Sequence, residues 1–494
     1  MSAPEHLRHS LRSSSRGVIG AQIASQVVSL GVLAVLYRLL GLEPYGLFGM
    51  VLPLLVLVEI LIASGLDVAT VQDAELSHEQ VSALFWVNQL LGLAMAGVTA
   101  ACAPVLVWFY GLRGHDVTGL GWVTVALAGT TVAAALGMQH QALLRRKLRL
   151  GTLAWARLAA QAAAGVAAIA AAMAGWGVWA LVVQRYVDLL ATAALVWSLE
   201  SWRPGFHLRR TGSMHLVRFG GHCTVASLMF YLVINADKVL VGFALGPAAL
   251  ALYGQAFNLM LKPVNVVLLP LTGVMLAVLS RAAPDRRQYG ELLLGFFRFI
   301  GLVMLPSAVG LAIVAGEAWR VLGGDDWAAA GPILSVLAAA ILVQGFVSAM
   351  GSVFASAGRA DLNSRASVGI AAALCTAFVV GLWLGRLAGQ PVLGVAASYS
   401  LTLILVVFPP YLWLGLRTVG LRCTDWLAQL RTAARATLAM SLVVLACRWV
   451  LTVLVPVPDL VLLLVEVVVG VACYAAFARR EIGWFARQAL TFGA

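Results

Sequence analysis

Charged residues are scarce in this chain of 494 residues. They make up 11% of the sequence, whereas hydrophobic residues make up 62%, and the mean hydropathy is +0.94. A soluble domain carries roughly 25% charged residues, and with far fewer it could not cover its surface in water. The surrounding solvent must therefore be lipid. We expect an all-α integral membrane protein, because a helix satisfies its own backbone hydrogen bonds.

Lysine is rarer still. The net charge is +12, but only three of the 33 basic residues are lysines, and most arginines lie in short segments between apolar runs. A nucleic-acid site needs a contiguous basic patch with exposed aromatic side chains, and this distribution does not provide one. We therefore expect the lipid bilayer, and no nucleic acid, as the partner of these charges.

Several signatures of catalysis and cofactor binding are also missing. The six cysteines are far apart and form no CxxC pair, the eight histidines show no ligand spacing, and no Gly-Lys-Ser or Gly-Lys-Thr sequence occurs. These absences argue against a metal or redox centre and against ATP hydrolysis by a P-loop. We expect no catalytic residue, no metal and no cofactor in this chain.

The apolar residues are grouped in long runs. A helix needs about 20 such residues to cross the hydrocarbon of a bilayer. About fourteen runs reach this length, at residues 17–40, 45–66, 84–110, 118–142, 152–174, 176–198, 217–244, 248–279, 290–315, 328–356, 363–386, 391–415, 433–455 and 459–478. The largest outer loop is expected at 317–327, which leaves no room for a soluble domain. The sequence thus predicts about 14 transmembrane helices.

Basic side chains fall mainly on alternate connections between these runs. Counted from a cytoplasmic N-terminus, the inner segments that carry them are 145–149, 203–210, 281–287, 359–365, 417–435 and the tail from 479. This is the positive-inside pattern. It predicts a multi-pass protein of the bacterial cytoplasmic (inner) membrane with both termini cytoplasmic. The inner loop at 67–82 departs from the pattern, because it carries acids and neither Lys nor Arg.

Two similar segments suggest an internal repeat. LLGLEPYGLFG (39–49) and FALGPAALALYG (243–254) match at an offset of 205 residues, with Gly41 opposite Gly246 and Gly49 opposite Gly254. Transporters built from parallel repeats handle their substrate between the halves. We therefore predict two pseudo-symmetric six-helix bundles plus a C-terminal helix pair. The expected divisions are a basic cytoplasmic N-terminus at 1–16, an N-terminal bundle at 17–199, a cytoplasmic linker at 200–216, a C-terminal bundle at 217–416, a second linker at 417–432, the helix pair at 433–478 and a cytoplasmic tail at 479–494.

Three stretches carry a family resemblance: YRLLGLEPYGLFGM (37–50), ELSHEQVSALFWVNQLLG (75–92) and NADKVLVGFALGPAALALYGQAFNLM (235–260). They resemble the polysaccharide transporter (PST) family, the Wzx-type oligosaccharide flippases of the multidrug/oligosaccharidyl-lipid/polysaccharide (MOP) exporter superfamily. The resemblance implies a V-shaped pair of bundles around a central cavity that opens alternately to the two sides. It also implies an undecaprenyl-pyrophosphate-linked saccharide as the cargo.

The function implied is that of a flippase and not of an enzyme. It would translocate a polyprenyl-pyrophosphate-linked oligosaccharide from the cytoplasmic to the outer leaflet by alternating access, for surface polysaccharide biosynthesis. The expected partners are this lipid-linked substrate, the bilayer, and separate glycosyltransferases and a polymerase of the same pathway; we expect a monomer. Two alternatives stay open. One is a transporter of the same superfamily for a peptidoglycan lipid precursor or a drug-like cation, and the other is a membrane saccharide polymerase or ligase.

Polar side chains inside the predicted spans are candidates for the substrate cavity, because a charge in hydrocarbon is costly. One set is spaced i, i+3, i+7 and i+10 and so shares a helical face: Gln255, Asn258, Lys262 and Asn265. With Asn235, the uncharged members form the predicted polar cavity face. The cations expected to hold the pyrophosphate are Lys262, Arg298, Lys238 and Arg185. In the competing interpretation, Arg185 pairs with Asp188, and Asp237 with a cation of a neighbouring helix, as structural bridges.

Acidic side chains inside the spans are candidates for ion coupling, because a carboxyl in a low dielectric can exchange a proton near neutral pH. These candidates are Asp237, Asp188, Asp67 and Glu59. Arg448 and Glu466 lie at similar depths in the last two predicted spans, and we expect a structural ion pair between them. Prolines inside spans should bend or break their helices; they include Pro263, Pro306 and the pair Pro409-Pro410.

Overall fold

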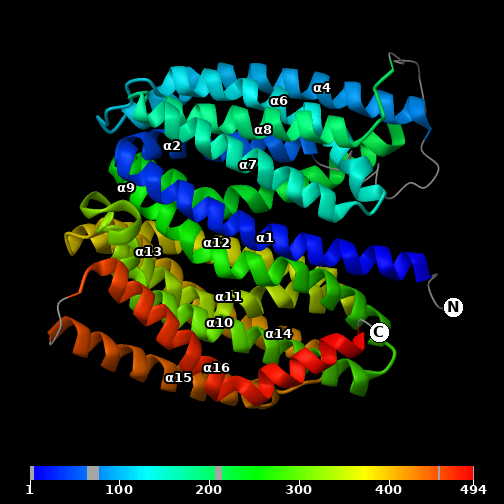
Figure 1. Ribbon diagram of the computed structural model, residues 1–494, viewed down its shortest axis with the longest axis vertical. Helices are drawn as coiled ribbons and strands as arrows, with labels where there is room; N and C mark the ends of the chain where they lie inside the picture. The colour runs from blue at the N-terminus through cyan, green and yellow to red at the C-terminus, as the bar shows by residue number, and fades with distance from the viewer. Residues whose placement is uncertain (1–4, 64–76, 206–213, 454–456, 493–494) are drawn as a thin grey trace. The chain divides into compact units, whose positions relative to one another are not determined.

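The computed structural model describes residues 5–63, 77–205, 214–453 and 457–492. Over these residues the chain is helical and contains no β-strand (Figure 1). The helices are α1 (Glu5–Leu40), α2 (Leu42–Ala63), α4 (His78–Ala101), α5 (Ala103–Gly111), α6 (Leu120–Arg146), α7 (Leu150–Met173), α8 (Trp179–Leu199), α9 (Met214–Ala282), α10 (Arg286–Gly323), α11 (Ala330–Ser356), α12 (Ala360–Leu387), α13 (Pro391–Leu401), α14 (Phe408–Val419), α15 (Cys423–Val453) and α16 (Asp459–Phe492).

Membrane-length helices dominate this fold. Thirteen helical segments of the described residues are long and apolar enough to cross a membrane. Two of the predicted runs, 217–244 and 248–279, both fall within α9, which accounts for the difference from the predicted count of about fourteen. The prediction of an all-α membrane fold is therefore confirmed, and the chain is a multi-pass membrane protein.

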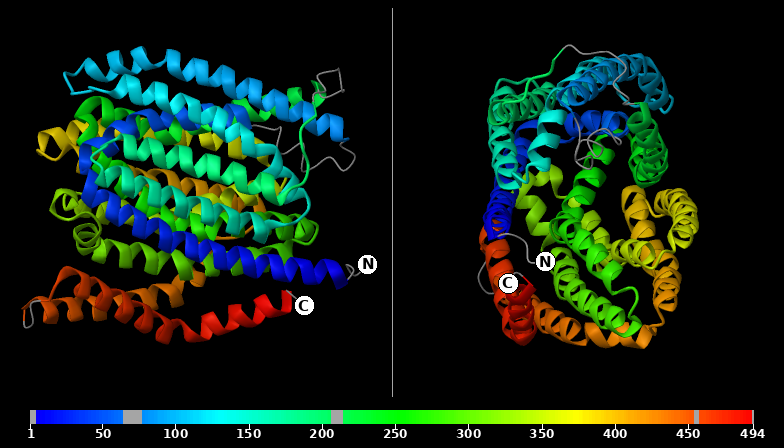
Figure 2. Two further views of the ribbon diagram at one scale, coloured as in Figure 1. Left: turned by 45° about the horizontal axis from the view of Figure 1, so that its top comes forward. Right: turned by 90° about the vertical axis from the view of Figure 1, so that its right-hand side faces the viewer.

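Backbone contacts divide the chain into two compact units, Met1–Ala251 and Leu252–Ala494. In the first unit, α7 packs between α1 and α8, and α6 packs against both α4 and α8. In the second unit, α10 packs against α11, α15 and α16, while α12 packs against α13. Within each unit the packed helices lie side by side over much of their length (Figure 2). The division into six-helix bundles with the boundaries given above stays a prediction.

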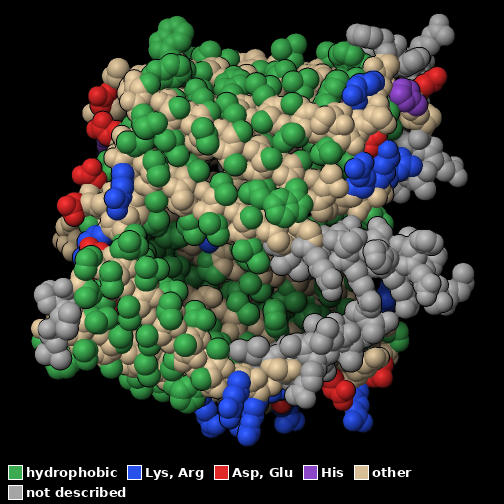
Figure 3. Space-filling model, viewed as in Figure 1, with side chains coloured by type: hydrophobic (Ala, Val, Ile, Leu, Met, Phe, Trp, Pro, Cys, Tyr) green, Lys and Arg blue, Asp and Glu red, His purple; other side chains and the backbone are tan. Residues whose placement is uncertain are grey.

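Large hydrophobic side chains cover the outer surface of the helices. On the face drawn in Figure 3, they dominate the area over α4, α6 and α7, and the acidic and basic side chains there lie toward the helix ends. Exposed examples are Leu93, Trp122, Val166 and Met173. A soluble protein does not expose apolar surface on this scale, so these faces are built for lipid.

One predicted loop is wrong at its start. The outer loop was expected from residue 317, but α10 continues to Gly323 and is followed by Gly324, at φ 74°, and a single 3₁₀ turn, Asp325–Trp327. Trp319 stacks on Trp327 with their ring centroids 5.4 Å apart. The helix continues beyond the apolar run. The charged side chains in the last turns of α10, Glu317 and Arg320, pair with each other, so these turns stay helical.

Two prolines are accommodated by side chains from other parts of the same unit. A proline in a helix has no N–H, so the carbonyl four residues earlier loses its partner. For Pro306 it is the carbonyl of Leu302, and the Tyr474 hydroxyl donates to it at 2.7 Å. Pro247 instead follows a break in the helix at Gly246, which leaves the Phe243 carbonyl open, and the His115 ring donates to that carbonyl from Nε2 at 3.1 Å. Neighbouring groups thus replace the missing backbone bonds, as prolines in a membrane require.

The other proline sites differ in how they are absorbed. Before Pro409-Pro410 the helix widens into one stretch of π-helix, Thr402–Val407, and continues as α14, so the pair does not break the helix. At Gly246 the backbone leaves helical geometry, with φ 86° and ψ −178°, and this break falls between the predicted runs 217–244 and 248–279. A conformation of this kind is open to glycine because it has no Cβ.

The two segments of the suggested repeat meet in the first unit. Gly41 and Gly246 occupy matching positions in the repeat, and both have positive φ, at 69° and 86°. A Cβ at Gly46 would collide with the backbone of Pro247, so α2 and α9 approach more closely there than any other residue would permit. The matched glycines Gly41 and Gly246 therefore serve turns, and Gly46, which has no glycine opposite it in the repeat, serves the helix contact.

A loop between two spans is fixed by an ion pair. Lys147, in the connection between α6 and α7, donates to both carboxylate oxygens of Glu200 at 2.7 and 2.8 Å. Burial by itself raises the pKa of Glu200, but hydrogen bonds from Lys147 and from the Trp202 N–H outweigh it, so the pKa lies below its ordinary value. The carboxylate is therefore ionised at neutral pH, and the pair ties this basic loop to the end of α8.

In the second unit, α16 runs antiparallel to α10. Arg298 of α10 pairs with Glu481 of α16, the Leu302 carbonyl accepts from Tyr474, and Arg320 pairs with Asp459. Residue numbers thus rise along α10 as they fall along α16. These three contacts fasten the two helices to each other from Arg298 of α10 to its last turns.

We predict that Tyr474→Phe destabilises the protein by about 0.5–1.5 kcal/mol, because it leaves the Leu302 carbonyl without its donor. In a Pro306→Ala background the backbone N–H returns to that carbonyl, so the same substitution should cost much less. Unfolding in detergent, followed for the four members of this double-mutant cycle, measures the difference. An equal loss in both backgrounds would contradict the proposed replacement of a backbone bond by Tyr474.

Candidate functional site

An ion pair links α2 and α8 in the first unit. Arg185 of α8 contacts Glu59 of α2, and both side chains are partly exposed. The sequence offered Asp188 as the alternative partner of Arg185; Asp188 lies one helical turn further along α8 and is half-buried. The structure therefore brings together one predicted substrate cation and one predicted coupling acid, on two different helices.

A second polar contact in the same unit was missed by the sequence analysis. Arg157 of α7 donates to the Gln141 side chain of α6 at 2.5 Å. Nearer to the middle of α7, Gln161 and Ser25 of α1 share hydrogen bonds at 2.5 and 3.2 Å. Arg157 itself could have indicated this contact from the sequence, since a charge inside an apolar run needs a partner or water.

The predicted polar stripe lies on the accessible side of α9. Asn258 and Asn265 are exposed, and Gln255 and Lys262 are half-buried. The opposite face of the same helix is buried and apolar, and consists of Tyr253, Ala256, Phe257, Met260, Val264 and Leu268. The i, i+3, i+7, i+10 spacing thus predicted which residues share a face, and that face is turned away from the packed core.

A cavity of about 890 Å³ lies within the second unit. Its walls come from α9, α10, α15 and α16, and they are almost entirely apolar. The described lining residues are Leu259, Lys262, Pro263, Phe299, Leu302, Val303, Pro306, Ser307, Gly310, Leu311, Ile313, Val314, Met440, Val444, Glu466, Val467, Gly470, Val471, Tyr474 and Ala475. Lys262 and Glu466 are the charged members of this set. A chamber of this composition suits an alkyl or prenyl chain that has an ionic group at one point.

The remaining predicted residues are placed as follows. Arg298 pairs with Glu481 across α10 and α16. Lys238 donates to Asn235, one turn earlier on α9, at 3.0 Å. Asp237 is buried, and Asp67 lies outside the described residues.

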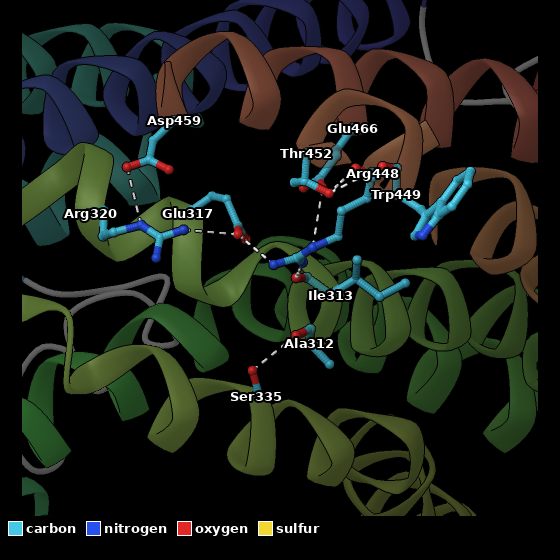
Figure 4. Close-up of polar contacts among 10 residues, drawn as sticks. All are labelled: Ala312, Ile313, Glu317, Arg320, Ser335, Arg448, Trp449, Thr452, Asp459 and Glu466. Atoms are coloured by element: carbon cyan, nitrogen blue, oxygen red, sulfur yellow. Dashed lines mark hydrogen bonds and ion pairs between the residues drawn. The ribbon is translucent and has the colours of Figure 1, made fainter. Parts of the chain in front are cut away.

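The last predicted pair belongs to a larger cluster at one end of the second unit. Arg448 of α15 and Glu466 of α16 are 3.9 Å apart, but the closer partner of Arg448 is Glu317 of α10, at 2.5 Å. Glu317 also contacts Arg320 at 3.1 Å, and Arg320 contacts Asp459 at 3.1 Å (Figure 4). Glu317 was not among the predicted site residues, because the apolar run ends before it and a loop was expected there.

The chain is similar to proteins of polysaccharide biosynthesis. The family model described as polysaccharide biosynthesis protein matches residues 35–332, which is more than half of the chain. The chain is 26% identical over 310 residues to the teichuronic acid biosynthesis protein TuaB of Bacillus subtilis (strain 168), a match that covers 62% of this chain and 63% of TuaB. The chain thus spans less than two thirds of the length of that relative.

A second relative and one solved structure agree with this match. The lipopolysaccharide biosynthesis protein WzxC of Escherichia coli (strain K12) is 22% identical over 387 residues, which are 77% of this chain and 76% of WzxC. The lipid II flippase MurJ in its inward closed conformation superposes with a TM-score of 0.70 at 15% identity, over 94% of this chain and 99% of MurJ. At that identity the superposition shows a common fold alone. On the strength of the family-model match, the chain belongs to the polysaccharide biosynthesis protein family, which confirms the resemblance noted in its sequence.

Proposed function

We propose that this protein is a flippase for a polyprenyl-pyrophosphate-linked oligosaccharide. It moves this substrate from the cytoplasmic to the outer leaflet by alternating access, as a step in surface polysaccharide biosynthesis. Family membership supports this proposal, and so do the names of TuaB and WzxC, which refer to teichuronic acid biosynthesis and to lipopolysaccharide biosynthesis. The fold shared with a lipid II flippase is consistent with a lipid-linked cargo.

The observation that carries the proposal is the composition of the cavity in the second unit. Its walls are apolar apart from a few side chains, so they would solvate a prenyl chain but not a free sugar. Lys262 adds a cation to the same walls, and an ammonium group is a suitable counter-charge for a phosphate oxygen. A lipid with a pyrophosphate head group combines the two chemistries that this cavity offers.

The cellular setting follows from the distribution of basic loops. We place the protein in the bacterial inner membrane with both termini in the cytoplasm, since the basic segments around Lys147 and Arg417 are then on the inner side. The substrate would come from cytoplasmic glycosyltransferases, and a polymerase would use it at the outer face. We propose a monomer as the working unit.

A peptidoglycan lipid precursor is the closest competing cargo. It also joins a polyprenyl chain to a saccharide through pyrophosphate, and the fold is that of a lipid II flippase. The cavity chemistry fits both cargoes equally, so they must be separated by experiment. Reconstituted vesicles should be offered each lipid in turn, together with a cationic dye as the test for a drug exporter. Selective transport of the dye would reject the flippase proposal.

We predict that Lys262→Ala lowers the initial flipping rate of a fluorescent polyprenyl-pyrophosphate saccharide about tenfold, which corresponds to about 1.4 kcal/mol of lost stabilisation. Lys262→Arg should retain most of the rate, because the positive charge remains. The matched control is Arg287→Ala, which removes an exposed cation paired with Glu291 on the surface of α10. Flipping is measured in vesicles by the accessibility of the fluorophore to an impermeant quencher. Equal rates for Lys262→Ala and Arg287→Ala would remove Lys262 from the substrate site.

A charge swap tests whether Arg185 serves the substrate or only the fold. Glu59→Arg and Arg185→Glu should each destabilise the protein, because each leaves two like charges in contact. The double variant restores the ion pair, so we expect it to recover thermal stability but to flip at a small fraction of the normal rate. Unfolding temperature and flipping rate are measured on the same preparations. Full recovery of both would make the pair purely structural.

A further inference from the structure

Five charged side chains form an alternating row at one end of the second unit. The row runs Asp459, Arg320, Glu317, Arg448, Glu466, and successive members are 3.1, 3.1, 2.5 and 3.9 Å apart (Figure 4). Its members come from α10, α15 and α16. No role was assigned to this row as a whole by the sequence analysis, and Glu317 and Asp459 were not candidates at all.

The two ends of this row differ in exposure, although exposure does not fall evenly from one member to the next. The Asp459 and Arg320 side chains are 43% and 41% exposed, whereas Arg448 is 33% exposed and Glu317 and Glu466 are 2% and 0% exposed. Glu466 also belongs to the wall of the apolar cavity. The row therefore leads from an accessible end of the helices to a buried carboxyl at the cavity.

The charges of the row do not balance. Three carboxylates face two guanidinium groups, which leaves one negative charge when every member is ionised. Arg448 is oriented toward α10, where it donates to Glu317 and, at 2.7 Å, to the Ile313 carbonyl. Neither carboxylate oxygen of Glu466 has a hydrogen-bond donor within the part of the chain that the structure describes. A buried carboxylate without donors is strongly disfavoured, and one bound proton would remove the excess charge.

The surroundings of Glu466 contain few other groups that titrate or carry charge. Arg448 of α15 contacts it, Glu317 of α10 lies on the other side of Arg448, and Lys262 of α9 shares the cavity wall; Arg320 of α10 is one contact further along the row. On α16 itself, Asp459 begins the row, and Tyr474 lines the cavity while its hydroxyl donates to Leu302. The other four members of the row are held in close pairs by opposite charges. Glu466 can therefore gain or lose a proton with less disturbance of these ion pairs than any other member of the row.

We propose that Glu466 is a proton-binding site whose protonation favours occupancy of the cavity by an anionic lipid head group, and that the row from Asp459 to Arg448 connects it with water. Ionised Glu466 repels a pyrophosphate in the same cavity, whereas the neutral acid does not. Proton binding and anion binding therefore strengthen each other reciprocally. The linkage to substrate rests on the proposed flippase function, but the proton site itself does not.

The proton site is tested first without any substrate. Difference infrared spectra of the purified protein are recorded between acidic and alkaline pH for the wild type, Glu466→Gln, Glu466→Asp and the control Glu291→Gln, which alters an exposed carboxyl. We expect a protonated-carboxyl band that Glu466→Gln abolishes, Glu466→Asp shifts and Glu291→Gln leaves unchanged. Unfolding temperatures confirm that each variant is folded. An unchanged band in folded Glu466→Gln overturns the proposal.

The linkage is tested by binding. The probe is a polyprenyl pyrophosphate esterified to a sugar, because its phosphates then have no group that titrates near neutral pH. For the wild type we expect the dissociation constant to rise with pH by up to about tenfold per unit, the limit for one coupled proton. For Glu466→Gln we expect it to be almost independent of pH, as the amide cannot ionise. The same pH dependence in both proteins overturns the linkage.

The two proposals fail in different ways. If the carboxyl band depends on Glu466 but the probe binds at no pH, the flippase function is rejected and the proton site stands. If the probe binds and is flipped while the band does not depend on Glu466, the flippase function stands and the proton site is rejected.

Discussion

Hydrocarbon offers no water to a polar group, and this constraint decides how the chain is built. Every backbone and side-chain group that enters a span has to find its partner inside the protein. The helix interruptions illustrate this directly, since the carbonyl left open by the break at Gly246 is taken by His115 and the one left open by Pro306 is taken by Tyr474. The pair at Pro409-Pro410 is absorbed instead by a change of helical winding over Thr402–Val407. Breaks in the helical ladder are thus sites of tertiary contact.

The same constraint governs the charges within the spans. Arg185 contacts Glu59, and Arg298 contacts Glu481, each across a pair of helices. Pairing lowers the free-energy cost of placing a cation in the membrane, but the positive electrostatic potential around the cation is not fully cancelled. A cation of this kind can serve both the fold and an anionic substrate that approaches its partly exposed side, which is why stability and transport have to be measured separately.

In the second unit, α10 is the element around which the cavity is organised. It runs antiparallel to α16, and the ion pairs Arg298–Glu481 and Arg320–Asp459 fasten the two helices at two places. Between these ion pairs the facing side chains are apolar and line the cavity, together with α9 and α15. Polar contacts therefore fix the frame, and the apolar section within it is left for a ligand. Glu466 lies between the row of charged side chains and the apolar wall of the cavity, so a change in its charge alters the electrostatic potential at both.

The sequence by itself determined the all-helical membrane fold, nearly the number of spans and the family. These depend on composition, on the length of apolar runs and on short motifs, all of which are local along the chain. It also determined that Gln255, Asn258, Lys262 and Asn265 share one face of a helix, because helical periodicity is local too. The division into two six-helix bundles rests on the repeat and stays a prediction.

Only the tertiary structure decided which charges meet. Glu59 and Arg185 are far apart in the sequence, and nothing local distinguishes Glu59 from Asp188 as the partner. Glu317 looked like the first residue of a loop because the apolar run ended before it. It lies in α10, where its carboxylate contacts both Arg320 and Arg448. Pairing between helices depends on how they rotate and pack against one another. That arrangement is set by the summed contacts of whole helices, and no single stretch of sequence encodes it.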